Sequence, residues 1–237
     1  MLVSIVIPTY NERNNILSLI KSISKTLNKR SINFEIIIVD DNSPDKTYEY
    51  IKDHYSNDFR IHLFQREKNR GLATAILLGI KKTRGSIIVG MDADFNHPPS
   101  LIPKLIDALS RADLVVASRF IPNGAMKEPI RYYFTYIFNL FLKYILGFPV
   151  LDNLSGYYAI KKKILITLSL QHIYQGYGDY HLRLLKSIQD RHLHIIQIPV
   201  KYGRRKYGQS KSQLLYLFFR YIWVAFQLTF NSVNKHN

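Results

Sequence analysis

The chain has 237 residues, enough for one α/β domain with a sizeable core, and its 47% hydrophobic and 21% charged residues exclude a disordered or low-complexity protein. The absence of cysteine excludes disulfide bonds and thiolate metal sites. With 33 Lys and Arg against 17 Asp and Glu, the formal net charge of +16 predicts a surface that attracts polyanions such as nucleic acid, acidic lipid headgroups or phosphorylated substrates.

The first half of the chain alternates short apolar runs with helical patterns. This alternation is typical of βαβ units and predicts an α/β fold with a mostly parallel sheet flanked by helices. The apolar runs predict strands at 3–8, 35–39, 61–64, 86–91 and 114–117. The segments between them predict helices at 14–27, 45–55, 72–82 and 99–109.

Four of these strands end in clusters of polar residues, at 8–12, 40–45, 92–94 and 118–119. In an open α/β sheet, ligands bind in the crevice beyond the carboxyl ends of the strands. We therefore expect the four clusters to converge on one site.

The sequence changes in character after about residue 125. The next predicted helix, at 130–146, is largely aromatic and aliphatic, with a narrow polar stripe in which residues recur at steps of four: Arg131, Thr135, Asn139 and Lys143. The elements that follow are a loop at 153–160 leading into a strand or turn, a helix at 180–189 and a strand at 194–200.

The last predicted helix, at 213–230, is apolar nearly all round, so protein or lipid must cover it. Basic residues lie among large apolar ones in 131–143 and 201–223, which favours a membrane surface over a nucleic-acid groove. The alternative is that the two apolar helices pack on each other as ordinary core. No apolar run in the sequence reaches the length of a secure membrane span.

Asp92 and Asp94 directly follow an apolar strand. Two carboxylates at this spacing can hold a hard divalent cation through oxygen ligands and leave positions for diphosphate oxygens and water. Such a cation would neutralise a departing nucleoside diphosphate. The alternative is a solvated turn that contains two aspartates, but the preceding strand and the following His97 with its two prolines favour a metal site, with His97 behind it.

Two other loops have the composition of a nucleotide-binding site. The segment 40–47 holds three acids, more than the one that Asp45 would supply as a helix cap, so a carboxylate here can accept hydrogen bonds from a base or ribose. An ordinary acidic loop is the alternative. Gly71 and the small residues up to Ala75 open a helix N-terminus to a phosphate or sugar. Neither a Walker loop nor a glycine-rich dinucleotide fingerprint is present in the sequence, which disfavours ATPases and dehydrogenases.

The ordered motifs at 8–12, 40–47, 71–75 and 92–99 resemble those of the inverting family 2 glycosyltransferases of GT-A fold, and more narrowly those of polyprenyl- or dolichyl-phosphate mannose synthases. The resemblance extends into the second half through two more segments, at 152–158 and 202–211. It implies a nucleotide-diphospho-sugar transferase fold with amphipathic interface helices. The implied divisions are a nucleotide-sugar-binding half at 1–125, an acceptor-binding half with an interface helix and mobile loop at 126–211, and a membrane-associating helix at 212–237.

The resemblance also implies roles for individual residues. The residues expected to bind the donor are Pro8, Tyr10, Glu12, Asp40, Asp41, Asp45, Gly71, Ala75, Asp92 and Lys211. The residues expected to bind the metal are Asp92, Asp94 and Asn96. Those expected to bind the acceptor phosphate are Arg119, Arg131, Thr135, Asn139, Arg205 and Ser210. The catalytic residues are Asp94, Arg205 and Asp179.

Three departures from the family pattern bear on these expectations. Asn96 stands where the family has a glutamine, and its shorter side chain weakens the case for direct metal ligation. The segment 176–183 lacks the glutamate that the synthases commonly place after Gly-Tyr, which is compatible with another sugar or acceptor. Many members also carry added transmembrane helices, whereas this chain stops after one apolar helix.

We therefore expect transfer of a hexose, mannose from GDP-mannose, to polyprenyl or dolichyl phosphate by inverting displacement assisted by Mn²⁺ or Mg²⁺. A phosphate acceptor is already a nucleophile near neutral pH and needs no strong base. The alternative acceptor, a sugar hydroxyl of a glycolipid or surface polysaccharide, would need one, and Asp179 is the candidate. Asp179 alternatively caps the helix that follows it.

The expected partners are a nucleotide-sugar donor, the lipid phosphate and a membrane surface, with the active site on the cytoplasmic face. A separate membrane subunit or a homo-oligomer is left open. The remaining alternative is a non-enzymatic basic module that binds nucleic acid. Asp92 and Asp94 argue against it because they would repel a phosphate backbone, so no nucleic-acid partner is expected.

Overall fold

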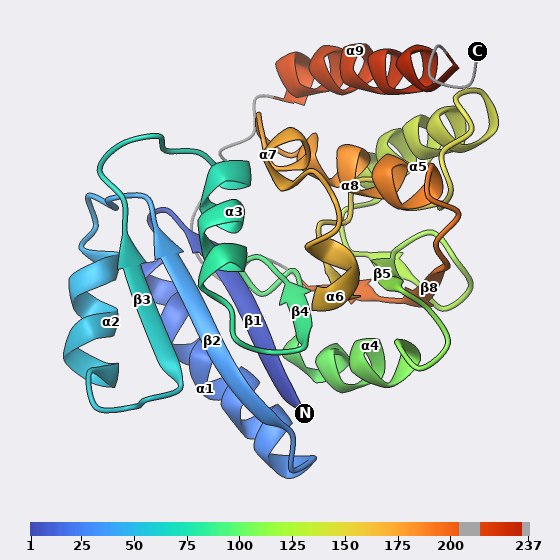
Figure 1. Ribbon diagram of the computed structural model, residues 1–237. Coiled ribbons are helices and arrows are strands. Elements are labelled where there is room, and N and C mark those ends of the chain that lie inside the picture. The colour runs from blue at the N-terminus through green and yellow to red at the C-terminus, as the bar shows by residue number, and fades with distance from the viewer. Residues whose placement is uncertain (204–213, 234–237) are drawn as a thin grey trace.

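A computed structural model describes residues 1–203 and 214–233 (Figure 1). The predicted loop residues Arg205, Ser210 and Lys211 lie outside these ranges. Within them, one sheet of seven strands has the order β3-β2-β1-β4-β7-β5-β8. Its strands are β1 (Leu2–Thr9), β2 (Asn33–Asp40), β3 (Ile61–Gln65), β4 (Ile87–Gly90), β5 (Leu114–Ser118), β7 (Tyr158–Lys161) and β8 (Ile195–Pro199). Two short strands, β6 (Ala125–Met126) and β9 (Lys201–Tyr202), pair separately.

Helices cover both faces of the sheet. They are α1 (Arg13–Lys29), α2 (Thr47–Tyr55), α3 (Leu72–Lys82), α4 (Ile102–Ala108), α5 (Pro129–Tyr144), α6 (Lys162–Leu165), α7 (Leu170–Ile173), α8 (Tyr180–Gln189) and α9 (Leu214–Val233). A 3₁₀ turn, η1 (Pro99–Leu101), precedes α4. Figure 1 shows α9 and α5 beyond one end of the sheet, with α9 lying across the top of the view.

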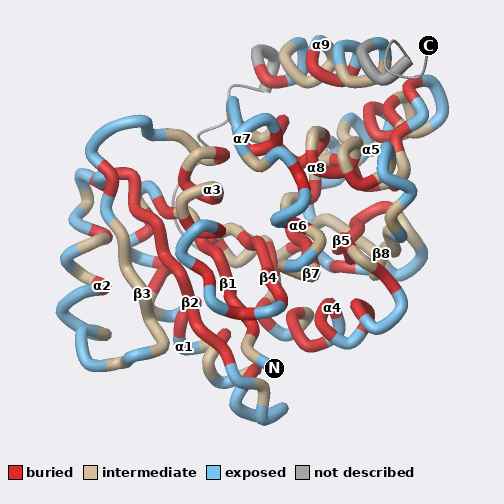
Figure 2. Tube along the Cα trace, in the orientation of Figure 1, coloured by how far each residue is buried: buried red, intermediate tan, exposed pale blue. Residues whose placement is uncertain are grey.

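The alternation of strand residues between the two faces builds two cores. In β1, Val3, Ile5 and Ile7 pack against the apolar stripe of α1 and against α4, whereas Val6 faces α3 on the other side. The second core continues through α6, α7 and α8. Figure 2 shows the result, with the central strands β1, β2 and β4 buried.

A third core joins the two apolar helices of the second half. Phe138 and Leu142 of α5, Leu182 of α8 and Ala225 of α9 are buried together. The inner faces of α5 and α9 therefore pack together in a buried core, as the alternative prediction stated. Their outer faces remain exposed, with large side chains that include Ile130, Tyr133, Phe134, Ile137, Phe219, Trp223 and Phe230. Within the described residues, none of the helices has the length and apolar character that crossing a membrane requires.

Most predicted elements are confirmed within a few residues, and the differences have local causes. The helix predicted from Asp45 begins at Thr47 because Lys46 has φ 61°, a left-handed conformation outside the helix. The loop predicted at 153–160 ends in β7, which is antiparallel to both of its neighbours, β4 and β5. β7 and β8 complete the same sheet as β1–β5, so the predicted acceptor-binding half shares its core with the donor half.

Candidate active site

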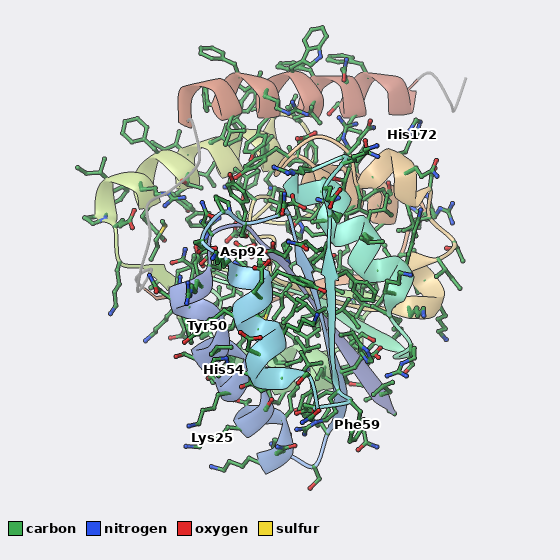
Figure 3. All side chains as sticks on the ribbon, turned by 90° about the vertical axis from the view of Figure 1, so that its left-hand side faces the viewer. Lys25, Tyr50, His54, Phe59, Asp92 and His172 are labelled. Atoms are coloured by element: carbon green, nitrogen blue, oxygen red, sulfur yellow. The ribbon has the colours of Figure 1, made fainter. Side chains whose placement is uncertain are left out.

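The predicted polar clusters converge at the carboxyl ends of β1, β2, β4 and β5. Parallel β1, β2 and β4 deliver three of them to one edge of the sheet. Figure 3 shows Asp92 at this end of the sheet, on the side of α5 and α9. The charge of Asp92 also acts on Arg119 after β5 and on Tyr221 of α9, so these groups share one region.

Asp40 fixes the first two loops to each other. Its carboxylate accepts hydrogen bonds from the hydroxyls of Thr9 at 2.9 Å and Ser43 at 2.6 Å, and from the backbone N–H of Ser43 at 2.8 Å. The side chain is fully buried. Its oxygens thus bond within the protein, and the predicted contact of Asp40 with the donor stays a prediction.

Asp45 and Glu12 hold the starts of α1 and α2. Asp45 accepts from the backbone N–H of Thr47 at 3.0 Å and from that of Arg13 at 3.1 Å. The backbone N–H of Glu12 donates to the Thr47 hydroxyl at 3.0 Å. Next to them, Tyr10, directly after β1, is exposed and Pro8 is half-buried.

Asp41 and Arg66 form a buried ion pair that shapes the N-terminus of α3. The Nε of Arg66 donates to Oδ1 of Asp41 at 2.7 Å, and the backbone N–H of Gly71 donates to Oδ2 at 2.7 Å. Arg66 also bonds the Gly71 carbonyl and the Thr74 hydroxyl. Gly71 has φ +133°, which only glycine adopts readily. Ala75 is buried in the core beneath this turn, and its predicted contact with the donor stays a prediction.

Arg66 was not among the predicted site residues. It directly follows β3, so the rule that ligands bind beyond the carboxyl ends of the strands applies to it as well.

Asp92 and Asp94 follow β4 and differ in exposure. The Asp92 side chain is 44% exposed, whereas Asp94 is buried. The backbone N–H of Asn96 donates to Oδ1 of Asp94 at 3.0 Å, and its side-chain amide donates to Oδ2 at 2.9 Å. Asn96 thus orients Asp94. In residues 1–203 and 214–233, no three or more His, Cys, Asp or Glu side chains are grouped to hold a metal ion.

His97 lies directly behind Asp92, as predicted. Its Nδ1 accepts the backbone N–H of Asp92 at 2.9 Å, and its ring stacks on Tyr157 with centroids 4.7 Å apart. Burial lowers the pKa of His97 to about 4, so the ring is neutral near pH 7. With Nδ1 accepting, the proton is on Nε2, which donates to the Tyr202 hydroxyl at 2.8 Å.

Arg119 is held by Asp152 beside the aspartates. Its Nε and Nη2 donate to the two Asp152 oxygens at 2.8 and 2.7 Å, and its guanidinium lies 4.7 Å from the centre of the Tyr202 ring. Burial opposes the charge of Arg119, but Asp152 outweighs it and raises the pKa of Arg119, with a smaller contribution from Asp92. Arg119 therefore stays positively charged, and it lies close enough to Asp92 for the two charges to interact.

The polar stripe of α5 divides into two parts. Arg131, in the first turn, forms an ion pair with Glu128 at 3.6 Å and is half-buried, as is Thr135. Tyr132 packs on Phe120 at 5.1 Å between ring centroids, which brings this turn next to Arg119.

Asn139, on the third turn of the stripe, is fully buried. Its Oδ1 accepts the backbone N–H of Asn153 at 2.7 Å, and its Nδ2 donates to the Thr135 carbonyl at 2.8 Å. Asn139 therefore fixes the loop that carries Asp152, and its predicted contact with the acceptor phosphate stays a prediction.

Asp179 is fully buried at the start of α8, and its carboxylate bonds to arginines on two helices. Oδ2 lies 3.3 Å from Nη2 of Arg183 on α8, and Oδ1 accepts Nε of Arg220 on α9 at 3.0 Å. Burial alone would raise the pKa of Asp179, but Arg220 and the backbone N–H of Tyr177 lower it below its ordinary value. It occupies the N-cap position of α8, but within the described residues its side chain makes no capping bond. The alternative prediction, that Asp179 caps α8, is therefore confirmed for its N-cap position but not for a side-chain capping bond.

Comparison with known proteins gives one family match. A model of Glycosyl transferase family 2 matches residues 4–169. The chain is 30% identical over 230 residues to a dolichol-phosphate mannosyltransferase of Pyrococcus furiosus, covering 94% of this chain and 63% of that protein. It therefore spans somewhat less than two thirds of that relative's length.

Two further comparisons cover more of the matched protein. The chain is 30% identical over 220 residues to an undecaprenyl-phosphate mannosyltransferase of Micrococcus luteus, covering 89% of this chain and 87% of that one. Among solved structures, glucosyl-3-phosphoglycerate synthase of Mycobacterium tuberculosis, in complex with Mn²⁺, UDP and glucosyl-3-phosphoglycerate, has a TM-score of 0.75 at 22% identity, covering 96% of this chain and 80% of that chain. This likeness establishes a shared fold.

Proposed function

Because the chain belongs to glycosyl transferase family 2, we propose that it transfers a hexosyl group, mannose from GDP-mannose, to a polyprenyl or dolichyl phosphate. The proposal is supported by the mannosyltransferases of polyprenyl phosphates among its relatives. The observation that carries it is that Asp92, after β4, and Arg119, after β5, lie at the same end of the sheet, where the charge of Asp92 contributes to the raised pKa of Arg119. A carboxylate suited to a donor diphosphate–metal complex thus lies beside a cation suited to an anionic acceptor.

The residues after β4 fit a hard divalent cation. Asp92 and Asp94 offer carboxylate oxygens, which Mn²⁺ and Mg²⁺ prefer, and Asp92 is open to solvent at the mouth of the site. We expect these two side chains to hold the cation, with Asn96 orienting Asp94. When bound, the cation neutralises charge that develops on the leaving diphosphate. Two protein carboxylates leave coordination positions for the diphosphate and water.

The donor nucleotide would lie along the loops after β1 and β2. Tyr10 offers an exposed ring to the base, and the Asp41–Arg66 pair fixes Gly71 so that the N-terminus of α3 faces the diphosphate or sugar. Asp41 therefore acts on the donor chiefly by shaping this turn.

The acceptor would meet the donor on the side of Arg119 and Arg131. A phosphate monoester is largely ionised near pH 7 and attacks the anomeric carbon without a strong base, so the arginines need only position it. A hydroxyl acceptor would need a base. Asp179 is poorly suited to that task, because its ion pairs with Arg183 and Arg220 hold its pKa below the ordinary value.

We also propose that the outer faces of α5 and α9 lie on a membrane. Phe134 is 75% exposed and Trp223 65% exposed, and such rings suit the level of the lipid headgroups. The net charge of +16 favours an anionic surface, as on the cytoplasmic leaflet, and the site would then face the cytoplasm. A membrane subunit or a homo-oligomer remains a prediction.

The test measures nucleotide release by purified protein with Mn²⁺ and GDP-mannose, UDP-glucose or UDP-N-acetylglucosamine, with and without polyprenyl phosphate. We expect release from GDP-mannose that depends on the lipid. Asp94→Asn should lower kcat by about a hundredfold or more, because a carboxylate beside the leaving group is lost. Asp107→Asn, which changes an exposed aspartate paired with Arg30, is the matched control and should leave kcat unchanged. Release that never depends on the lipid would exclude the proposed acceptor.

A further inference from the structure

Helix α9 reaches the active-site loops through two neighbouring polar side chains. Arg220 donates from Nε to the buried Asp179 at 3.0 Å. The Tyr221 hydroxyl lies against Gly178, so closely that a Cβ on Gly178 would stand 2.2 Å from it. Both contacts fall on one short turn, 176–179, which precedes α8. The inner face of α9 therefore touches this turn directly.

The turn and the ion pair depend on each other. Gly176 has φ +75°, and a Cβ at this position would stand 2.2 Å from Nη2 of Arg220 and 2.6 Å from Oδ2 of Asp179. The backbone N–H of Tyr177 donates to Oδ1 of Asp179 at 2.8 Å. The chain thus wraps around the carboxylate, and only glycine at 176 leaves room for the guanidinium.

The same turn borders the proposed donor site. The carbonyl oxygen of Gly176 lies 4.0 Å from the Cβ position of Gly71, at the N-terminus of α3. A displacement of the turn would therefore change the surroundings of this helix N-terminus.

We propose that Arg220 is a positioning residue of the active site, whose ion pair with Asp179 holds the 176–179 turn in place as a wall beside Gly71 at the N-terminus of α3. The inference rests on the proposed function for the identity of the substrates. It adds that α9 belongs to the catalytic unit. The same helix exposes Phe219 and Trp223, so the helix proposed to touch lipid also shapes the donor site.

The chain offers a matched control for this proposal. Among the described residues, Asp179 bonds two arginines: Arg220 connects it to α9, whereas Arg183 lies on α8 itself. Removing either side chain takes one cation from the same carboxylate. An effect specific to Arg220 therefore reports the connection to α9 rather than the stability of Asp179.

The experiment compares Arg220→Gln, Arg220→Lys and Arg183→Gln with the unchanged chain on phosphatidylcholine–phosphatidylglycerol vesicles that contain polyprenyl phosphate. Because misplacement of a site wall by about 1 Å can cost up to about a hundredfold in rate, we expect Arg220→Gln to lower kcat at least about tenfold. Arg220→Lys should restore part of kcat, since the charge is kept. Arg183→Gln should stay within about twofold of the unchanged chain. All variants should cosediment equally with vesicles. Equal kcat for Arg220→Gln and Arg183→Gln would overturn the proposal.

A second measurement separates this proposal from the proposed function. Hydrogen exchange at the backbone amide of Tyr177, which bonds Asp179, needs no substrate. We expect faster exchange in Arg220→Gln and little change in Arg183→Gln. This outcome would support the positioning role even if no tested donor or acceptor gave turnover. Unchanged exchange in Arg220→Gln would refute the role whatever the substrates are.

Discussion

At the scale of single residues, His97 connects the loop of Asp92 with the surroundings of Arg119. It accepts the backbone N–H of Asp92, and its Nε2–H reaches the Tyr202 hydroxyl, which in turn donates to the carbonyl of Ser155 at 2.8 Å. Tyr202 lies under the Arg119 guanidinium. A buried chain of hydrogen bonds, followed by a ring contact, therefore connects the loop of Asp92 with the Arg119 guanidinium.

Replacing His97 should disturb the loop that carries Asp92. His97→Phe keeps a ring against Tyr157 but leaves the Asp92 N–H without its acceptor, at a cost of about 1–3 kcal/mol. We expect the Mn²⁺ concentration for half-maximal activity to rise about tenfold. His97→Asn retains an acceptor and should be less affected. A titration of activity against Mn²⁺ measures this, and equal midpoints for the two variants would contradict it.

The sequence was most informative about residues that follow strands. Asp92 and Arg119 lie at one end of the sheet as expected, because strand polarity alone decides this. It was least informative about burial. Asp40 and Asn139 are of residue types that often bind ligands, yet the side chains of both are buried and form hydrogen bonds within the protein. Which polar side chain turns inward depends on contacts between segments far apart in sequence.

At the scale of elements, α3 approaches the sheet unusually closely. A Cβ on Gly79 would stand 2.5 Å from Cγ1 of Val6 in β1. A glycine inside a helix ordinarily costs stability relative to alanine, by roughly 0.5–1 kcal/mol. Its presence here is explained by packing, since it lets α3 seat its N-terminus beside the donor loops.

Gly79→Ala should therefore destabilise the protein despite the better helix propensity of alanine. Overpacking of a core typically costs about 1–3 kcal/mol. Urea unfolding measures the free energy of unfolding of this variant, of Val6→Ala and of the double variant. The double variant should be more stable than the sum of the single changes predicts, because the smaller residue at 6 makes room. Stabilisation by Gly79→Ala alone would contradict the packing argument.

Helices and buried strands were predictable because their periodicity is local. The predicted helices at 72–82 and 180–189 match α3 and α8 residue for residue. The short elements were not predicted. β6 and β9 have two residues each, too few to form a pattern, and they exist only because they pair with each other. α6 and α7 are single turns that fill the second core.

At the scale of the whole molecule, a second buried cluster ties the opposite end of the sheet together. Glu35 of β2 accepts the Ser4 hydroxyl of β1 at 2.6 Å and the backbone N–H and Nε of Arg84 before β4 at 2.6 and 2.9 Å. Burial alone would raise the pKa of Glu35, but the hydrogen bonds from Ser4 and Arg84 lower it. Three segments thus depend on one carboxylate.

This cluster predicts a loss of stability in acid. Because the pKa of Glu35 is lower in the folded chain than the value of about 4.3 in the unfolded one, its contribution is complete above that value and is lost as pH falls through the folded pKa. Glu35→Gln should be less stable than the unchanged chain at pH 7, with a difference that shrinks below about pH 4. Urea unfolding at several pH values measures it. A difference independent of pH would exclude the ionised carboxylate as the cause.

The predicted fold and family resemblance are confirmed by the family match over residues 4–169 and by the shared fold with a solved structure at a TM-score of 0.75. The order of strands was not predictable. β7 lies between β4 and β5, although more than thirty residues of α5 and its loops separate β5 from β7 in sequence. Such a placement depends on non-local pairing, which no local pattern encodes.

The position of β7 also constrains how the protein is made. β4 and β5 have no bond to each other in the sheet order and are joined only through 158–161. While the ribosome is still translating the segment before Tyr158, β4 and β5 of the nascent chain present unpaired apolar edges that invite wrong association. Closure of the sheet must await this late strand, so a ribosome pause shortly before it would prolong the interval in which chaperones are needed.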